Sequence, residues 1–354
     1  MRILIVSGGT GGHISPGLSI YNRLKEAKHD ILFITNPHAL KFPLIKDNIP
    51  SNELEVIPIS SGFTRNLLKN LVVIKDAILS FFKSLKIILN FKPDRIVLTG
   101  GYVSGPVGLA GLILRKPIIL LEQNAVMGLT NKIISLFAKK VILTFPLVDK
   151  KNYPNNFERI GNPIRYGERD IQLKDYAKNT FGFSSDDKVI GIILGSQGAK
   201  NVNKIISENI HELTKEYKVI WITGQDYYQE ILEKCKNESN VKIFDFINDV
   251  SSFMSAIDVA ITRGGASTIS ELSFFGVPSL IIPFPYASKN HQYHNAMFAE
   301  SRGAGIVIEE NDLTISKILE TIDLLFKNYD IFKSNMKKLF PRDTTNKVIQ
   351  QILD

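Results

Sequence analysis

The sequence predicts an α/β protein with two doubly wound parallel sheets, one after the other along the chain. Two observations predict this fold. Short β-branched apolar runs alternate with longer helical patterns over most of the 354 residues, which is typical of buried parallel strands covered by helices on both faces. The alternation also stops once, in the polar stretch 149–156 and the segment IGNPIR (160–165), and then begins again. We therefore expect two domains joined by a linker.

Each domain has its own series of expected strands. In the first domain, residues 1–160, they are 3–6, 31–35, 95–99, 118–121 and 140–144. In the second domain, residues 161–340, they are 189–194, 218–223, 241–244, 259–262, 279–282 and 305–308. The ending 341–354 carries an amphipathic helical pattern, which we expect to pack back on the first domain. The result would be two Rossmann-like domains that face each other across a cleft.

The first strand runs directly into the glycine-rich segment GGTGGH (8–13), which leads into a helix. Glycines let the backbone approach an anion closely, and the helix points its N–H groups and positive dipole end at the charge. The segment is not a dinucleotide fingerprint, because Ile14 stands where the third glycine would fall and Asn36, not an acidic residue, follows the next strand. His13 adds an imidazole at the mouth of the turn.

Four more segments follow predicted strands: TGGYVSGP (99–106), LEQN (121–124), GSQGA (195–199) and TRGGASTISE (262–271). Ligands of such sheets bind beyond the carboxyl ends of the strands. The two glycine turns of the first domain therefore indicate two anionic groups, and the carboxylate and amides at 122–124 suit sugar hydroxyls. The alternative for any single loop is a tight connection with no ligand.

The second domain carries side chains suited to a nucleotide sugar. Ser267 or Thr268 can cap the helix after the glycine turn and meet a phosphate, and Glu271 can accept hydrogen bonds from a ribose diol. The alternative for Glu271 is a purely helix-stabilising role. Gln292, at the start of a later helix, is a candidate sugar contact.

Composition narrows the class of protein. The formal net charge of +8 indicates an anionic partner, but no basic and aromatic module of a nucleic-acid-binding protein occurs, so we expect no nucleic acid. The single cysteine, Cys235, excludes a disulfide framework. A first strand directly after Met1, with no apolar run near ~18 residues, predicts a cytoplasmic protein. No Asp-x-Asp motif or metal-ligand spacing occurs, so no metal or cofactor is required, although Mg²⁺ stimulation stays open.

Residues 65–92 combine basic and apolar side chains in the manner of a membrane-surface segment. Asp76 is the one acidic residue among six basic ones. The alternative is a pair of ordinary core helices with solvated lysines. We expect only a subset of the apolar residues to touch lipid, namely Leu67, Leu68, Leu71 and Phe82.

Taken in order, GGTGGHISPG (8–17), GGYVSGP (100–106), EQN (122–124), GNPIR (161–165), GSQGA (195–199) and residues 263–271 resemble the MurG family. These are the undecaprenyl-diphospho-muramoylpentapeptide β-N-acetylglucosaminyltransferases of peptidoglycan synthesis. The resemblance covers nearly the whole chain. One departure is Leu194, where many members have a glycine.

The resemblance implies a GT-B fold and an inverting, UDP-GlcNAc-dependent hexosyltransferase. It would move GlcNAc from UDP-GlcNAc to the muramoyl 4-hydroxyl of lipid I and so make lipid II. The resemblance also implies a peripheral enzyme at the cytoplasmic face of the inner membrane. Its expected partners are anionic inner-leaflet phospholipid and, as candidates, proteins of cell-wall synthesis and cell division.

The resemblance also implies residue roles. Donor contacts would come from Ile247 beside the uracil, Glu271 on the ribose, Asn124 and Gln292 on the GlcNAc, and Arg165. The remaining donor and cleft contacts would be Thr10, Gly11, Gly12, Ser196, Ala266, Ser267, Thr268, Ile269 and Ser270. The acceptor side would be formed by Gly101, Tyr102 and Ser104.

The attacking hydroxyl needs a base, and His13 is the first candidate by residue type and place. Glu122 is the alternative base. The helix after Gly265 would stabilise the leaving diphosphate. Two rival functions remain: a UDP-GlcNAc 2-epimerase, which needs no lipid acceptor, and a non-catalytic membrane-bound scaffold that binds a UDP-sugar.

Overall fold

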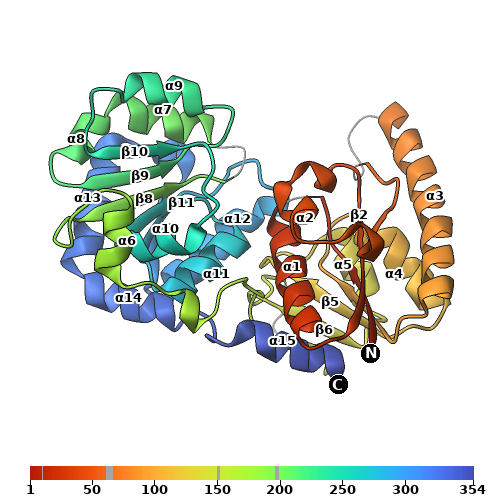
Figure 1. The fold of residues 1–354 in the computed structure, drawn as a ribbon. Helices are drawn as coiled ribbons and strands as arrows, with labels where there is room; N and C mark the ends of the chain where they lie inside the picture. The colour runs from red at the N-terminus through yellow and green to blue at the C-terminus, as the bar shows by residue number, and fades with distance from the viewer. Residues whose placement is uncertain (10, 61–66, 150–151, 196–198) are drawn as a thin grey trace. The chain divides into compact units, whose positions relative to one another are not determined.

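The computed structural model describes residues 1–9, 11–60, 67–149, 152–195 and 199–354. The chain forms two compact units, each with its own core (Figure 1). Unit 1 consists of Met1–Arg165 together with Asp343–Asp354, and unit 2 is the continuous segment Tyr166–Arg342.

Unit 1 is built on a parallel sheet. Within the described ranges it has seven strands in the order β3-β2-β1-β4-β5-β6-β7. The strands are β1 (Arg2–Val6), β2 (Asp30–Thr35), β3 (Leu54–Val56), β4 (Arg95–Leu98), β5 (Ile118–Glu122), β6 (Lys140–Leu143) and β7 (Phe157–Arg159). The apolar run Ile3 to Val6 forms β1, which lies inside the sheet between β2 and β4. All four of its side chains are fully buried, as is typical of a strand that is covered on both faces.

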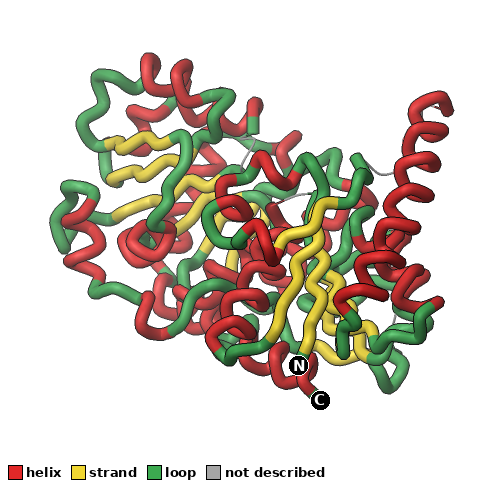
Figure 2. Tube along the Cα trace, turned by 45° about the vertical axis from the view of Figure 1, so that its right-hand side comes forward, coloured by secondary structure: helices red, strands yellow, loops and turns green. Residues whose placement is uncertain are grey.

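Helices cover both faces of this sheet (Figure 2). One face carries α1 (Gly11–Glu26), α2 (Pro43–Lys46) and α15 (Thr344–Leu353). Val348 and Ile352 of α15 belong to the same hydrophobic core as Leu18 of α1. The other face carries α3 (Leu67–Phe91), α4 (Ser104–Ile113) and α5 (Leu129–Ile134). The last helix of the chain therefore completes the core of the first unit.

Unit 2 repeats the arrangement. Its described sheet has six parallel strands in the order β10-β9-β8-β11-β12-β13. They are β8 (Val189–Ile193), β9 (Lys218–Ile222), β10 (Val241–Phe244), β11 (Val259–Thr262), β12 (Ser279–Ile281) and β13 (Gly305–Val307). The helices are α6 (Lys174–Thr180), α7 (Lys200–Glu208), α8 (Ile210–Thr214), α9 (Tyr228–Lys234), α10 (Val250–Ala256), α11 (Ala266–Phe275), α12 (His291–Ser301), α13 (Ile315–Lys327) and α14 (Tyr329–Lys337).

The predicted class, two doubly wound parallel sheets in succession, is confirmed. Every predicted strand is present, and two more appear at the edges of the first sheet. β3 pairs with β2, and β7 pairs with β6 between the two segments expected to form the linker. Both extra strands have three residues and none is fully buried, so neither carries the buried apolar run that marks a central strand.

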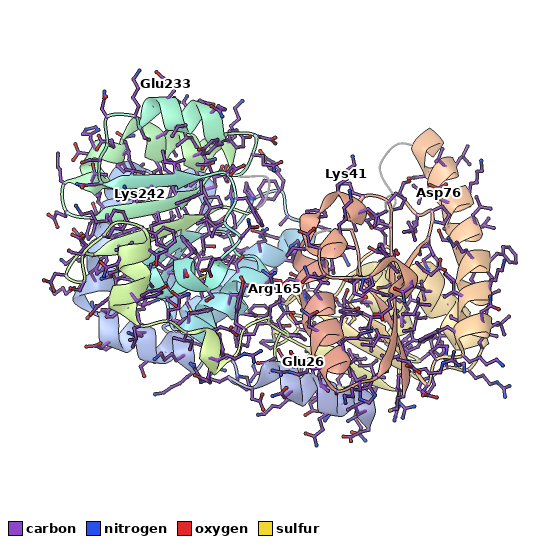
Figure 3. The ribbon with its side chains drawn as sticks, in the orientation of Figure 1. Glu26, Lys41, Asp76, Arg165, Glu233 and Lys242 are labelled. Atoms are coloured by element: carbon purple, nitrogen blue, oxygen red, sulfur yellow. The ribbon has the colours of Figure 1, made fainter. Side chains whose placement is uncertain are left out.

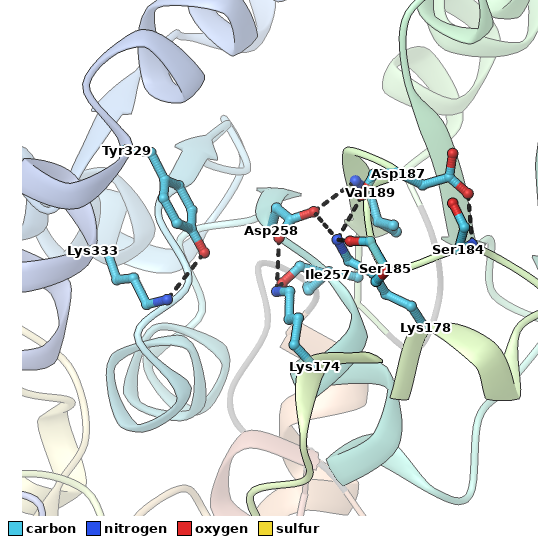
Figure 4. Close-up of polar contacts among 10 residues, drawn as sticks. All are labelled: Lys174, Lys178, Ser184, Ser185, Asp187, Val189, Ile257, Asp258, Tyr329 and Lys333. Carbon is cyan, nitrogen blue, oxygen red and sulfur yellow. Dashed lines mark hydrogen bonds and ion pairs between the residues drawn. The ribbon is translucent and has the colours of Figure 1, made fainter. Parts of the chain in front are cut away.

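The amino ends of the central strands of unit 2 are joined by a partly buried charge cluster (Figure 4). Asp258, just before β11, accepts a hydrogen bond from the N–H of Val189 at 2.8 Å. Its carboxylate also lies 2.9 Å from Lys174 Nζ and 3.3 Å from Lys178 Nζ, both on α6. This cluster attaches α6 to the edge of the sheet opposite the carboxyl ends.

Candidate functional site

The glycine segments of both units follow the strands at which the sheet order reverses. In unit 1 the reversal falls between β1 and β4, and in unit 2 between β8 and β11. Residues 7–9 follow β1 and residues 99–103 follow β4, so the two turns are neighbours at one edge. Open α/β sheets bind ligands at such a switch point.

The first turn is held by Asn36, which follows β2 and is fully buried. Its Oδ1 accepts from the N–H of Gly9 at 3.1 Å, and its Nδ2 donates to the Tyr102 hydroxyl at 3.1 Å. One side chain thus joins the turn after β1 to the turn after β4. Sequence reasoning missed this role, although an amide residue at the carboxyl end of a strand is the signal that points to it.

The His13 imidazole lies against the second glycine turn. His13 is half-buried in the first turn of α1. Gly100 and Gly101 have φ values of +95° and +74°, a region that favours glycine. A Cβ on Gly100 would lie 3.3 Å from His13 Cδ2, and one on Gly101 would lie 3.5 Å from Cε1. The buried Ser104 hydroxyl closes the turn by accepting from the Gly100 N–H at 3.1 Å.

Glu122, the last residue of β5, is only 3% exposed, and both of its carboxylate oxygens accept hydrogen bonds. Oε1 accepts from the N–H of Asn124 at 3.0 Å, and Oε2 accepts from the N–H of Gly128 at 3.3 Å and from Asn131 Nδ2 at 2.8 Å. Burial raises the pKa of the Glu122 carboxyl above its usual value, even though these donors act in the opposite direction.

The Glu122 network reaches the turn beside His13 through Asn131. A Cβ on Gly100 would lie 3.0 Å from Asn131 Nδ2, so the amide packs against the same glycine as the imidazole. Asn131 lies inside a helical pattern, and no sequence signal singles it out.

In unit 2 the turn after β11 contacts the start of α12. A Cβ on Gly264 would collide with the backbone carbonyl of Gln292, so only glycine permits this approach. Asn295 Nδ2 donates to the Gly264 carbonyl at 3.1 Å, and Gln292 Oε1 accepts from the N–H of Phe284 at 3.0 Å. The structure therefore brings Gln292 to the same turn that precedes Ala266.

A buried ion pair supports this turn. Arg263 Nη2 lies 2.6 Å from Glu310 Oε2, and both side chains are nearly inaccessible to solvent. Glu310 Oε1 also accepts from Asn201 Nδ2, at the start of α7, at 2.8 Å. Glu310 thereby connects the turn after β11 to the helix that follows β8. Sequence reasoning missed Glu310, which lies far from both partners along the chain.

The first turns of α11 divide into inward and outward side chains. Ile269 is fully buried, and the Ser270 hydroxyl donates to the Ala266 carbonyl at 2.8 Å, so both face the core. Ser267, Thr268 and Glu271 are half-buried. The N-cap, Gly265, offers no side-chain oxygen to the first N–H groups, so an anion can take that place.

A cavity of about 480 Å³ lies beside Ile247 at the end of β10. Phe181, Phe244 and Phe246 contribute rings to its wall. Lys242 of β10 also lines it (Figure 3). The wall thus combines three aromatic rings with polar and charged side chains such as Lys242, Asn248 and Asp249, which suits a flat polar ring.

The other expected site residues are placed as follows. Gly11 and Gly12 begin α1, Asn124 is half-buried after β5, and Arg165 ends the first segment of unit 1 (Figure 3). Thr10 and Ser196 lie outside the described residues. Among the described residues, no group of three or more His, Cys, Asp or Glu side chains could hold a metal ion.

The segment expected at a membrane surface forms one helix, α3, which extends past the ends of α4 and α5 (Figures 1 and 2). Leu71 and Phe82 are 64% and 63% exposed, whereas the side chains of Leu67 and Leu68 lie outside the described part. No helix among the described residues is long and apolar enough to span a membrane. Other exposed apolar residues of this helix are Val72, Ile74, Ile78, Leu79 and Leu89.

Comparison with protein families matches both halves of the chain. Residues 3–143 match the N-terminal domain of glycosyltransferase family 28, and residues 189–352 match its C-terminal domain. The chain is 35% identical to the UDP-N-acetylglucosamine-N-acetylmuramyl-(pentapeptide) pyrophosphoryl-undecaprenol N-acetylglucosamine transferase of Acetivibrio thermocellus, over 100% of this chain and 98% of that protein. It is 36% identical to the Aquifex aeolicus protein of the same name, over 99% of each.

Solved structures share the fold. The crystal structure of Acinetobacter baumannii MurG has a TM-score of 0.75 and 24% identity, and the match covers 99% of each chain. The UDP-GlcNAc 2-epimerase of Methanocaldococcus jannaschii has a TM-score of 0.65 and 14% identity, over 100% of this chain and 99% of that one. These likenesses confirm the expected GT-B class. Because the epimerase shares it, the fold alone does not select the reaction.

Proposed function

The chain belongs to glycosyltransferase family 28, among the relatives named N-acetylmuramyl-(pentapeptide) pyrophosphoryl-undecaprenol N-acetylglucosamine transferases, and from that membership we propose that it transfers GlcNAc from UDP-GlcNAc to lipid I. The product is lipid II, a step of peptidoglycan synthesis. The observation that carries the proposal for this chain is the position of His13, an imidazole held between two glycine turns at the switch point of unit 1.

His13 acts as the general base in this proposal. The muramoyl 4-hydroxyl attacks the anomeric carbon from the face opposite the departing UDP, so the configuration inverts. Neutral imidazole accepts the proton of that hydroxyl, a contribution typically worth about 10²–10⁴ in rate. Gly101, Tyr102 and Ser104 form the turn beside the ring, where the backbone approaches the acceptor diphosphate.

Glu122 is a positioning residue in this proposal. A base must reach the reacting hydroxyl, but the Glu122 carboxylate is buried and accepts three N–H groups. Glu122 positions Asn124, which contacts the GlcNAc in this proposal. Through Asn131, it also positions the turn beside His13.

Unit 2 binds the donor. The uracil lies at the aromatic cavity beside Ile247, and the diphosphate lies at the N-terminus of α11, where N–H groups and the Ser267 and Thr268 hydroxyls stabilise the charge of the leaving UDP. Glu271 accepts from the ribose and Gln292 contacts the sugar. Ser196, Arg165 and the backbone at Thr10, Gly11 and Gly12 complete the proposed donor set, and Ile269 and Ser270 contribute through their backbone.

The enzyme works at the cytoplasmic face of the membrane, where α3 meets anionic lipid. Leu71, Phe82 and the exposed Lys75 and Lys86 support this. A Lys75→Glu/Lys86→Glu variant is expected to lose most of its binding to anionic vesicles in sedimentation. The same double change at Lys327 and Lys338, exposed lysines of unit 2, should leave binding intact. Equal binding by the two variants would contradict a role for α3.

The function is tested by transfer of radiolabelled GlcNAc from UDP-GlcNAc to a short-chain lipid I analogue. Wild type should form the lipid-linked disaccharide, and His13→Ala should lower kcat by about 10²-fold or more. His38→Ala, which changes an exposed histidine of the same unit, should retain full activity. Release of a free epimerised sugar without acceptor would instead identify an epimerase.

A further inference from the structure

The ion pair between Arg263 and Glu310 has no role in the function described so far. Its side chains are 10% and 7% exposed, and the two charged atoms lie 2.6 Å apart. Burying an ion pair stabilises a fold little, because the cost of removing both charges from water offsets their attraction. The pair lies at the carboxyl edge of its sheet, where such sheets bind ligands, so its position indicates a role in the site.

This ion pair joins the carboxyl ends of four strands. Arg263 directly follows β11, and its Nη1 donates to the carbonyls of Ile282 and Pro283, after β12, at 3.1 and 3.4 Å. Glu310 follows β13, and its Oε1 accepts at 2.8 Å from Asn201 in the first turn of α7, the helix after β8. Because the sheet order reverses between β8 and β11, the pair spans the switch point of unit 2.

The turn that begins at Arg263 is packed too closely to absorb a displacement. A Cβ on Gly264 would lie only 2.2 Å from the carbonyl oxygen of Gln292. Asn295 Nδ2 donates to the Gly264 carbonyl at 3.1 Å from the same helix. A shift of the Arg263 side chain would therefore move the backbone that leads into α11.

Both α7 and α11 begin at this edge without a capping oxygen. Their N-cap residues are Ala199 and Gly265, whose side chains cannot accept from the first N–H groups, and such N–H groups attract an anion. We propose that Glu310 is a positioning residue for the donor diphosphate. It fixes the start of α7 through Asn201 and the start of α11 through Arg263.

The inference rests on the proposed function, which places the diphosphate of UDP-GlcNAc at α11. Negative charge on the diphosphate increases as its bond to the anomeric carbon breaks. N–H groups that are held in place beforehand stabilise this charge best, because they need no reorientation during the reaction. A misplacement of about 1 Å can lower a rate by about 10²-fold.

The ratio of the affinities for UDP and uridine measures this role without catalysis. Glutamine at position 310 has one accepting oxygen, so it cannot serve Asn201 and Arg263 together. In calorimetry of the full-length protein, Glu310→Gln should weaken UDP binding by about tenfold, the value of one hydrogen bond to a charged group. Uridine lacks the diphosphate, so its affinity should stay unchanged. In the transfer assay kcat should fall by about tenfold or more, with the KM for the lipid I analogue unchanged.

Two further variants separate positioning from stability. Lys178→Met removes a buried cation at the opposite edge of the same sheet, and it should leave the ratio of UDP to uridine affinity as in wild type. Arg263→Met/Glu310→Met replaces the pair by apolar side chains, a change that commonly preserves stability. This double variant should lose UDP affinity as Glu310→Gln does, although it stays folded.

Three results would overturn the inference: a wild-type ratio in Glu310→Gln, an equal loss of UDP and uridine affinity in that variant, and a wild-type ratio in the double methionine variant. The transfer of GlcNAc is scored separately. If Glu310→Gln loses only UDP affinity but wild type transfers no GlcNAc, the proposed reaction fails and the positioning role holds. If wild type transfers GlcNAc and the ratio does not depend on Glu310, the positioning role alone fails.

Discussion

Glu122 is a site residue that acts by positioning its neighbours. The glutamate was expected as a candidate base because it follows a strand at the ligand edge, and sequence alone cannot show which way such a carboxylate faces. In the structure its two oxygens accept from the N–H groups of Asn124 and Gly128 and from Asn131. These three donors favour a positioning role, and they leave His13 as the candidate base.

The raised pKa of Glu122 predicts a pH-dependent stability. A carboxyl whose folded-state pKa is above its unfolded value stabilises the fold fully below the unfolded pKa, and this contribution is lost as pH rises through the folded pKa. Glu122→Gln cannot ionise. The free energy of unfolding of wild type minus that of Glu122→Gln should therefore be larger at pH 5 than at pH 8.

Urea unfolding of both proteins at the two pH values, followed by circular dichroism, measures this difference. A difference that instead grows with pH would mean that the three donors outweigh burial and lower the pKa. Glutamine replaces one accepting oxygen by an amide donor, and because this loss is the same at both pH values, the change of the difference with pH isolates ionisation.

At the scale of elements, the central strands could be predicted from the sequence. The edge strands, and the side chains that connect separate turns, could not. Runs such as Ile3 to Val6 are buried on both faces, so their composition identifies them. β3 and β7 are short and partly exposed, and their composition resembles that of loops. The glycine turns were predictable because glycines and amides directly follow strands. Asn131 and Glu310 were not, because their partners are defined only by the folded chain.

The charge cluster at the base of unit 2 makes a prediction about α6. Lys178 is 5% exposed, and its Nζ donates to the carbonyls of Ser185 at 3.0 Å and Asp187 at 2.6 Å, besides its ion pair with Asp258. Lys178→Met leaves these acceptors buried without their donor and should cost about 3 kcal/mol of stability. Lys174→Met, at a side chain 36% exposed, should cost about 1 kcal/mol or less.

The single tryptophan, Trp221, is fully buried in the core of unit 2. Its fluorescence during denaturation therefore reports the unfolding of that unit, and it provides the measurement for the lysine variants. Equal losses for the two lysines would show that burial does not set the strength of this cluster.

At the scale of the whole molecule, α15 makes unit 1 discontinuous in sequence. Val348 and Ile352 are fully buried, and the Thr345 hydroxyl donates to the Ile164 carbonyl at 2.9 Å. Removing residues 344–354 should cost roughly 3 to 6 kcal/mol for the two aliphatic side chains alone, a large part of the usual 5–15 kcal/mol of a domain. The truncated chain should lose transferase activity, although none of the proposed site residues is removed.

Limited proteolysis and the Trp221 signal distinguish the two units in this experiment. Unit 1 should become sensitive to protease, while the unfolding transition reported by Trp221 should stay unchanged. Loss of both together would show that the two units unfold as one.

The position of α15 also affects folding during translation. Domains commonly fold as they leave the ribosome, the first before the second. Here the core of unit 1 includes Val348 and Ile352 of α15, which are synthesised after the whole of unit 2, Tyr166–Arg342. The first 165 residues therefore wait for α15 before their core is complete, and until then their sheet presents to chaperones the apolar strip that α15 will cover.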